Sequence, residues 1–343
     1  MIQEKNLDTL LDRLESLCVP ILGHIYLTDR CQFSCPHCYR ASKLIGDELT
    51  LYDWLRLLEE FKTEGCMDLT FSGGEPLLHP DWRKIIMEAN KLKFSYEIMT
   101  NGFAMTEADA EFLTQNNCRE LHISMHGWGE THDKFVGAAG SFTHCKLLAE
   151  YAVKLGLKTV IKMSLMHSNF HDASLLAKWS RDIGTIFGPS YYIIPRFNSN
   201  ENEFLEDRLT PKEIRQCEHD YSEWTGRPSF SNCHDENGPY FCNMGWNRFA
   251  IDAHGQIYPC SQVKEPVGEV KTKSFREVWR YSERMNELRR RKNEKIDLCS
   301  NCEMEASCKF RCMGLFHLST GKYEEPSPLH CEITAAWLGL DNF

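Results

Sequence analysis

The stretch that decides the fold is HIYLTDRCQFSCPHCYR, residues 24–40. Its first part, HIYLT, has the composition of a short strand, and three cysteines follow at the spacing C-x3-C-x2-C. Soft thiolate ligands select zinc, Cu(I) or iron–sulfur clusters. Three thiolates on a 4Fe–4S cluster leave one iron open, and an open iron can bind a substrate or cosubstrate. The spacing therefore predicts a reactive metal site at Cys31, Cys35 and Cys38.

Two other interpretations of the three cysteines stay open on spacing alone. A zinc site needs a fourth ligand to complete its tetrahedron. His37 lies awkwardly between two of the cysteines for that purpose, whereas His24 remains available. Redox-active thiols without a metal are the other alternative. The surrounding sequence has to decide between these chemistries.

Short apolar strands alternate with amphipathic helices along the first two thirds of the chain. Besides 24–28, strands are expected at 67–72, 95–100, 121–125, 157–166 and 190–197. Each is followed by a helical segment, and this alternation predicts a parallel sheet with covering helices. The fold class is therefore α/β, and ligands are expected at the ends of the strands. We expect a partial (β/α)6 TIM-like barrel over 23–225, preceded by an N-terminal helix over 1–22.

The pattern changes after about Glu223, where Gly, Pro, Asn and Cys become frequent. The segment 247–263 predicts a β-hairpin that turns at 252–255, and 274–292 predicts one helix. The rest is loop-rich, and a chain with so little periodic core needs bound metal to stabilise it. A small second domain is therefore expected over 226–343.

Composition limits the possible functions. The 16 cysteines among 343 residues fall short of the roughly 8–10% of a disulfide scaffold, and cytosolic cysteines more often bind metal or react. A net charge of −10 gives no support for nucleic-acid binding. No run of about 18 apolar residues predicts a membrane span, and the charged N-terminal stretch lacks the apolar core of a signal peptide. We therefore expect a cytoplasmic protein without nucleic-acid or membrane partners.

Two further motifs decide the chemistry of the first site. SGGEP (72–76) follows the second expected strand and MTNG (99–102) follows the third. Together with the cysteine triad they resemble the radical S-adenosylmethionine (SAM) superfamily. In that family the triad holds a 4Fe–4S cluster, SAM chelates the fourth iron, and the Gly-Gly-Glu turn binds the SAM amino group. The resemblance implies these cofactor-binding residues: Gly73, Gly74, Glu75, Pro76, Thr100 and Asn101.

Elementary chemistry agrees with this assignment. Two glycines allow a backbone to approach a ligand closely, and a carboxylate suits an ammonium group. By the same resemblance, Ser124, Lys162 and Ser164 would reach the ribose and the carboxylate of SAM, although a serine on a strand is often structural. Further cofactor contacts are expected from His37, which would stack on adenine, and from Arg196.

The segment 124–142 resembles a part of the family's peptide-modifying branch, with two departures. His126 stands where relatives usually have an acid, and Val136–Gly137 stands where they have an Arg-Gly pair. Any ion pair that those residues make in relatives is therefore not expected here.

The later cysteines follow a second pattern, C-x12-G-x4-C, a gap, C-x2-C-x5-C-x3-C, a gap and C. All seven positions fit the SPASM extension of radical SAM enzymes, which holds two auxiliary 4Fe–4S clusters. By resemblance the distal cluster has the ligands Cys299, Cys302, Cys308 and Cys331. The proximal cluster has Cys242, Cys260 and Cys312, with Cys233 as the favoured fourth ligand. An open iron at the proximal cluster is the alternative, and a pair of structural zinc sites is the alternative for the whole set.

Two positions bear on the substrate. Sulfatase-maturing relatives carry an aspartate directly after the Gly-x4-Cys cysteine, and Ser261 stands there in this chain, which argues against formylglycine formation. About 22 residues precede the first strand, too few for a peptide-recognition domain. A leader peptide would then need a separate binding protein or direct contacts with the barrel.

The resemblance implies that a flavodoxin or ferredoxin reduces the triad cluster, that SAM is cleaved, and that a 5′-deoxyadenosyl radical abstracts hydrogen from a C–H bond. We expect maturation of a ribosomally made peptide by a cross-link or an oxidation. The alternatives are a small-molecule enzyme acting on an aminoglycoside or haem precursor, and a non-catalytic iron–sulfur carrier. The other cysteines are expected to be small buried residues, and Cys217 is the candidate if one of them donates hydrogen to a substrate radical.

Overall fold

In the computed structural model the chain forms two compact units. The first comprises Met1–Arg30, Leu44–Glu97 and Phe241–Glu294, and the second Cys31–Lys43, Ile98–Tyr240 and Lys295–Phe343. The structure describes residues 13–14, 16–40, 46–191, 193–194, 196, 206–227, 242–291, 296–305, 308 and 312–340. Within these ranges no helix is both long and apolar enough to cross a bilayer. Most of the N-terminal helix expected over 1–22 lies outside the described residues.

The first unit is built on strand β1 (Leu22–Tyr26), which pairs in parallel with β2 on one side and β7 on the other. Antiparallel strands β8 and β9 continue the sheet from β7. The remaining elements of this unit are β2 (Asp68–Ser72), β7 (Arg248–Ile251), β8 (Gln256–Tyr258), β9 (Gly268–Glu269), α2 (Leu51–Thr63), η1 (Pro76–Leu78), α3 (Trp82–Lys91), α9 (Phe275–Tyr281) and α10 (Glu283–Arg291).

An aromatic core joins the sheet of this unit to its helices. The rings of Phe61, Phe249 and Phe275 lie 4.7–4.8 Å apart between centroids. Gly23 of β1 makes room for them, because a Cβ there would lie 2.6 Å from the ring of Phe249. The expected hairpin is confirmed, with Gly255 at φ +89° in the turn between β7 and β8.

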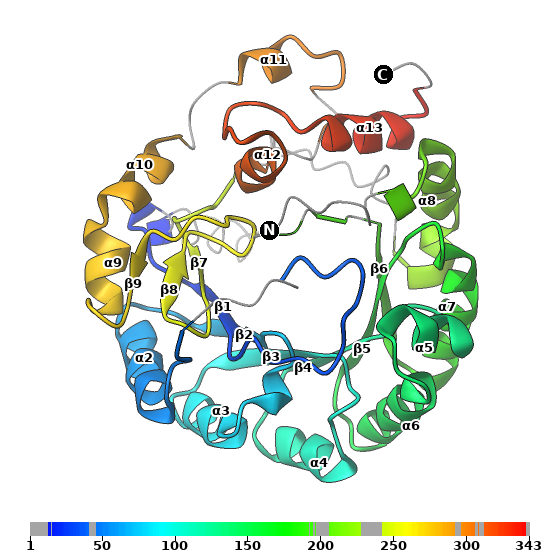
Figure 1. The fold of residues 1–343 in the computed structure, drawn as a ribbon, viewed down its shortest axis with the longest axis horizontal. Coiled ribbons are helices and arrows are strands. Elements are labelled where there is room, and N and C mark those ends of the chain that lie inside the picture. Colours follow the sequence, from blue (N-terminus) through cyan, green and yellow to red (C-terminus); the bar gives the residue numbers. More distant parts are fainter. Residues whose placement is uncertain are drawn as a thin grey trace, which may run out of the picture. The chain divides into compact units, whose positions relative to one another are not determined.

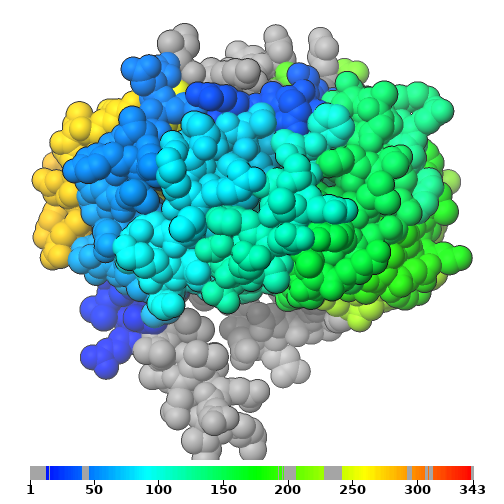
Figure 2. Space-filling view, turned by 90° about the horizontal axis from the view of Figure 1, so that it is seen from below, coloured from blue at the N-terminus to red at the C-terminus, as the bar shows by residue number. Residues whose placement is uncertain are grey.

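The second unit contains three parallel strands, β4 (Glu120–Ser124), β5 (Thr159–Ser164) and β6 (Ile186–Ser190). They run side by side with α6 and α7 packed against β5 and β6 (Figure 1). Residues of α6 and α7 form a continuous outer surface (Figure 2). The helices of this unit are α4 (Glu107–Gln115), α5 (Glu130–Val136), α6 (Ser141–Lys154), η2 (Phe170–Asp172), α7 (Ala173–Ile183), α8 (Pro211–Thr225), α11 (Asp297–Ser300), α12 (Met313–Thr320) and α13 (Pro328–Trp337).

Strand β3 (Ser95–Thr100) passes from the first unit into the second. The strands β1 to β6 are each followed by a helix along the chain, and the pairs β1–β2, β4–β5 and β5–β6 are parallel. The predicted α/β fold class is confirmed.

The sixth strand lies earlier than the sequence suggested. We expected it at 190–197, but β6 ends at Ser190. The described residues between Ser190 and position 197 are not in a strand. The pair Gly188–Pro189 resembles a turn in sequence, yet both residues lie within β6. Proline is tolerated in strands that need no donor on one side. At Gly188 a Cβ would lie 3.1 Å from Lys162 Cδ on the neighbouring strand, so a larger residue would require that side chain to shift slightly.

The single helix expected at 274–292 is interrupted. Ser282 has an extended ψ of 122° between α9 and α10. Its hydroxyl donates to the carbonyl of Val267 at 2.6 Å and accepts from the backbone N–H of Met285. The serine therefore ends one helix and begins the next. Helices α12 and α13, in the region expected to be loop-rich, were also missed.

The compact units do not follow the expected boundaries at 22/23 and 225/226. Strand β7, from the second expected domain, pairs with β1 from the first. Helix α13 packs against α8, which belongs to the expected barrel. The domain boundaries therefore stay a prediction.

Candidate functional site

The triad loop, residues 31–40, is fixed to the end of β3 by Asn101. The amide of Asn101 donates to Cys31 Sγ at 3.7 Å. Its oxygen accepts from Gln32 Nε2 at 2.9 Å and from the backbone N–H of Phe103 at 3.0 Å. Thr100 caps the same turn by accepting from the N–H of Gly102. The MTNG motif therefore orients a cysteine of the triad, a function that the sequence had not assigned to it.

The three thiols lie close enough to affect one another electrostatically. Burial and the neighbouring thiols Cys38 and Cys31 raise the pKa of Cys35 to about 12. Burial also raises the pKa of Cys38, which Arg40 and Arg196 oppose. Metals bind the thiolate form, and a bound cation removes the cost of gathering such charges. The residues present therefore fit a thiolate-ligated iron–sulfur cluster.

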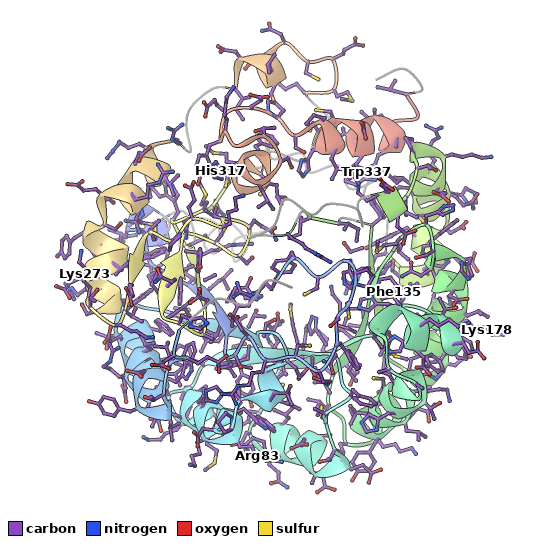
Figure 3. All side chains as sticks on the ribbon, viewed as in Figure 1. Arg83, Phe135, Lys178, Lys273, His317 and Trp337 are labelled. Carbon is purple, nitrogen blue, oxygen red and sulfur yellow. The ribbon has the colours of Figure 1, made fainter. Side chains whose placement is uncertain are left out.

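Arg196 and His37 hold the other end of the triad loop. Arg196 donates to the carbonyl oxygen of Pro36 at 3.2 Å. The ring of His37 contacts His126 at 4.5 Å and Phe135 at 5.1 Å between centroids. Phe135 points from α5 into the interior of its unit, whereas Lys178 points outward (Figure 3). His126, which stands in place of the usual acid, thus packs on the triad loop.

The Gly-Gly-Glu turn packs tightly on the end of β1 within the first unit. Gly74 donates to Thr28 O at 2.7 Å, and Glu75 donates to Arg30 O at 2.8 Å. A Cβ on Gly73 or Gly74 would lie 2.6 Å or less from these backbone oxygens. The glycines are thus required by the close approach of two protein segments, whereas the sequence had suggested approach to a ligand.

Glu75 itself is fully buried, and its carboxylate accepts from the N–H of Leu77 at 3.2 Å. Pro76 begins the short helix η1 directly after it. A buried carboxylate at a strand end is a suitable partner for an ammonium group.

The residues expected at the ends of β4 and β5 lie on two neighbouring parallel strands. Ser124 lies in register with Lys162, and Lys162 with Gly188. Lys162 also lines a cavity of about 420 Å³ that Tyr191 and Trp337 border. Ser164 donates its backbone N–H to Nδ1 of His126 at 3.3 Å. The structure therefore brings these residues together, and their contacts with SAM stay a prediction.

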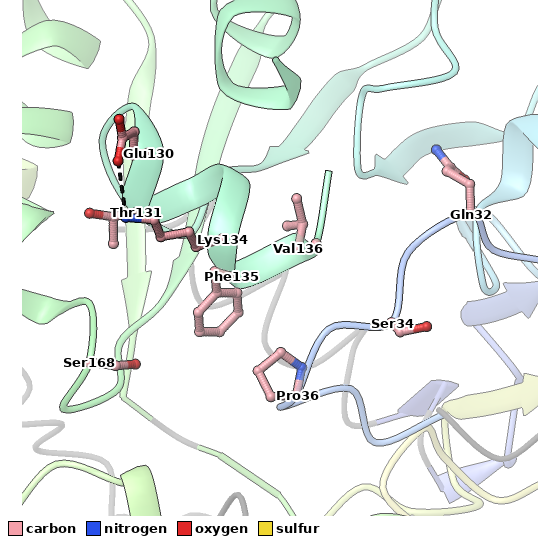
Figure 4. Close-up of a pocket in the computed structure, with 10 residues that line it drawn as sticks. Gln32, Ser34, Pro36, Glu130, Thr131, Lys134, Phe135, Val136 and Ser168 are labelled. Carbon is pink, nitrogen blue, oxygen red and sulfur yellow. Dashed lines mark hydrogen bonds and ion pairs between the residues drawn. The ribbon is translucent and has the colours of Figure 1, made fainter. Parts of the chain in front are cut away.

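A larger cavity of about 770 Å³ lies directly beside the triad loop. The loop contributes Gln32, Ser34 and Pro36 to its wall, and α5 contributes Lys134 and Phe135. Pro36 and Phe135 face each other across it (Figure 4). Its volume falls within the range of about 300–1,000 Å³ typical of ligand sites.

The four cysteines assigned to the distal cluster line one cavity in the second unit. Cys299, Cys302, Cys308 and Cys331 share it with His330. Burial raises the pKa of Cys331, with further contributions from the thiols of Cys308 and Cys302. Four converging thiols in an apolar setting suit an iron–sulfur cluster.

Three of the four cysteines assigned to the proximal cluster lie among the residues that the structure describes. Gly245 donates to the carbonyl of Pro259 at 2.8 Å, which holds the segments of Cys242 and Cys260 together. Cys312 is the N-cap residue of α12 in the second unit. Cys233 lies outside the described residues, so closure of this cluster stays a prediction.

The remaining cysteines are buried except for Cys18, which is half-buried. Cys217 is fully buried in α8, and burial raises its pKa to about 12. Reactive thiols have lowered pKa values and solvent access, so this is the environment of a core thiol. Its role as a hydrogen donor stays a prediction. Cys145 donates to the carbonyl of Asn101 at 3.2 Å, a supporting contact that the sequence pattern did not reveal.

Comparison with known protein families decides between the chemistries left open by the cysteine spacing. The model of the radical SAM superfamily matches residues 25–179, and that of an iron–sulfur cluster-binding domain, SPASM, matches residues 242–303. This chain carries a radical SAM domain. The SPASM match places an auxiliary-cluster region after the radical SAM domain and confirms the predicted family.

Individual relatives of this radical SAM protein have different activities. It is 23% identical over 270 residues to the sporulation killing factor maturation protein SkfB of Bacillus subtilis. That match covers 76% of this chain and 65% of SkfB. It is also 23% identical over 332 residues to the AdoMet-dependent heme synthase of Methanosarcina barkeri. That match covers 88% of this chain and 93% of the heme synthase.

Among solved structures, SuiB of Streptococcus suis, bound to S-adenosylmethionine, has the same fold. The TM-score is 0.72 at 18% sequence identity, and the match covers 95% of this chain and 81% of SuiB. This likeness supports the predicted α/β architecture with a C-terminal SPASM region.

Proposed function

We propose that the chain binds a 4Fe–4S cluster through Cys31, Cys35 and Cys38, cleaves SAM and removes a hydrogen atom from a substrate C–H bond. When bound, the cluster supplies the electron that splits SAM into methionine and the 5′-deoxyadenosyl radical. The single observation that carries this proposal is the gathering of the three thiols in a loop that Asn101 anchors. The reductant is expected to be a flavodoxin or ferredoxin.

The chain's own residues have separate tasks in this proposal. Glu75 binds the SAM amino group, and Asn101 orients Cys31. Ser124, Lys162 and Ser164 provide polar groups for the ribose and carboxylate of SAM. The cavity beside the triad loop admits the substrate.

The preferred substrate is a ribosomally made peptide that acquires a cross-link or an oxidation. Support comes from SkfB, whose name describes a maturation protein, and from the resemblance of 124–142 to the peptide-modifying branch. A separate leader-binding protein would serve as a further partner. The auxiliary clusters, proposed at the distal set and at Cys242, Cys260 and Cys312 with Cys233, would accept or relay an electron.

A haem precursor is the second candidate substrate, and one observation favours it. The chain covers 93% of the length of the heme synthase but 65% of that of SkfB.

The test uses the protein reconstituted with iron and sulfide under anaerobic conditions and reduced chemically. Release of 5′-deoxyadenosine supports the radical SAM proposal, and Cys35→Ala should abolish it. A carrier without catalytic activity would release none. Peptides from neighbouring short reading frames and haem precursors are then supplied separately. Mass spectrometry distinguishes loss of two hydrogens, expected of a cross-link, from loss of carbon dioxide, expected of a decarboxylation.

A further inference from the structure

His37 carries a buried nitrogen that none of the described residues satisfies. Its Nδ1 is shielded from solvent and has no hydrogen-bond partner among them. Buried polar atoms in folded proteins nearly always have a partner, because leaving one unsatisfied is unfavourable. The residue lies between two cysteines of the triad. The atom is therefore available to a group that binds at the triad.

Neighbouring rings fix the imidazole of His37. His126 meets it at an interplanar angle of 65°, Phe135 lies on another side, and these two rings are themselves 4.9 Å apart. His126 is held in turn, since its Nδ1 accepts from Ser164 N and its backbone N–H donates to Nδ1 of His132 at 2.9 Å. The imidazole is thus packed into place, while its Nδ1 has no hydrogen-bond partner in the part of the chain that the structure describes.

The chemistry of the ring differs from that of a phenyl or phenol ring at this position. The imidazole ring carries two nitrogens, Nδ1 and Nε2, at its edge, where a phenyl ring has none. A neutral imidazole has one donor and one acceptor nitrogen. Stacking on adenine would use the face of the ring and leave Nδ1, on its edge, unsatisfied.

We propose that Nδ1 of His37 makes a hydrogen bond to the cofactor assembly at the triad, with His126 and Phe135 holding the ring in place for that bond. The partner is a sulfur of the cluster, which would accept from Nδ1–H, or the adenine amino group of SAM, which would donate to Nδ1. This inference rests on the proposed function. It adds a specific polar contact to the adenine stacking expected from the family.

The experiment compares reconstituted wild type with three substitutions of His37. His37→Phe keeps a planar ring but deletes the nitrogen, His37→Asn places a polar atom near the position of Nδ1, and His37→Gln places one near Nε2. For each protein we measure the dissociation constant of SAM by anaerobic equilibrium dialysis. The EPR signal of the triad cluster is first identified as the one that changes when SAM is added. The midpoint potential of that signal is then measured without SAM.

If SAM is the partner, His37→Phe weakens SAM binding about 3- to 10-fold with an unchanged potential, a loss expected for one hydrogen bond. If a cluster sulfur is the partner, His37→Phe lowers the potential already without SAM, because hydrogen bonds to sulfur stabilise the reduced cluster. In either case His37→Asn restores more than His37→Gln. Phe135→Leu, which alters the packing but no ring nitrogen, is the matched control and should change both quantities less than His37→Phe.

Wild-type SAM affinity and potential in His37→Phe would overturn the inference. Equal effects of Phe135→Leu and His37→Phe would do the same, because packing alone would then account for them. Should His37→Phe fail to hold its cluster, the comparison of His37→Asn with His37→Gln decides, and rescue by Gln alone contradicts the role of Nδ1. Failure of the proposed function is distinguishable, since wild type itself would then release no 5′-deoxyadenosine.

Discussion

Replacing Gly74 with alanine tests the close packing of the Gly-Gly-Glu turn. The added Cβ would lie 2.4 Å from the carbonyl oxygen of Arg30 and 2.9 Å from that of Asp29. Both are backbone atoms, so neither can rotate out of the way. The end of β1 and the turn after β2 would therefore have to move apart.

The magnitude follows from the contacts that such a movement would disturb. Overpacking that forces a backbone shift costs about 1–3 kcal/mol. The hydrogen bonds from Gly74 to Thr28 and from Glu75 to Arg30, at 2.7 and 2.8 Å, are each worth about 0.5–1.5 kcal/mol. We expect Gly74→Ala to destabilise the protein by about 2–6 kcal/mol. Because Arg30 directly precedes Cys31, SAM binding should weaken as well.

The matched control is Gly137→Ala at the end of α5. Gly137 has φ +74°, and an added Cβ would meet nothing within 4 Å. Its cost is the left-handed conformation alone, about 1–2 kcal/mol. Thermal unfolding of the reconstituted proteins should show a Tm lowered by about 3–8 °C for Gly74→Ala and about 1–3 °C for Gly137→Ala. Equal Tm values for the two variants would refute the reasoning.

Three further predictions concern the second unit. Cys308→Ser should lower the iron content by about four atoms per chain, as measured by elemental analysis, and zinc in place of iron in wild type would contradict the distal cluster. Burial lowers the pKa of His132 from 6.5 to about 4, so the unfolded state binds the extra proton first and stability falls as pH drops below about 6.5. Denaturation at pH 7 and pH 5 should show that His132→Asn, which retains an acceptor near Nδ1, removes about 2 kcal/mol of that difference; an unchanged difference would count against the burial argument. Lys134→Trp, which fills the cavity beside the triad loop, should slow substrate modification while 5′-deoxyadenosine is still released without substrate, and equal loss of both would exclude a substrate role for the cavity.

The sequence was most informative where chemistry requires particular residue types at fixed spacing. The cysteine triad and the seven later cysteines pointed to the family. One family model matches residues 25–179, which contain the triad, and the other matches residues 242–303, which contain four of the seven later cysteines. The alternation of strands and helices predicted the α/β fold, because buried parallel strands and amphipathic helices leave different periodic patterns.

The errors came from residues whose role depends on tertiary contacts. Gly188 appears in sequence as a turn residue, but it lies in a strand beneath the side chain of Lys162. In sequence Ser282 resembles an ordinary helical position, but in the structure its hydroxyl donates a hydrogen bond to the carbonyl of Val267. Asn101 was expected to bind SAM, and its bond to Cys31 joins segments far apart in the chain. No local pattern indicates such partners, so only the folded structure reveals them.

The position of Cys331 on α13 has a consequence for biogenesis. Helix α13 packs against α8, and Trp337 at its end meets Tyr191 at 5.9 Å between ring centroids. Iron bound at the distal cysteines would therefore hold α13 in place against α8. Resistance to proteolysis would then depend on insertion of that cluster, because a chain without it would expose α8 to proteases. Limited proteolysis during reconstitution would follow this protection as it develops.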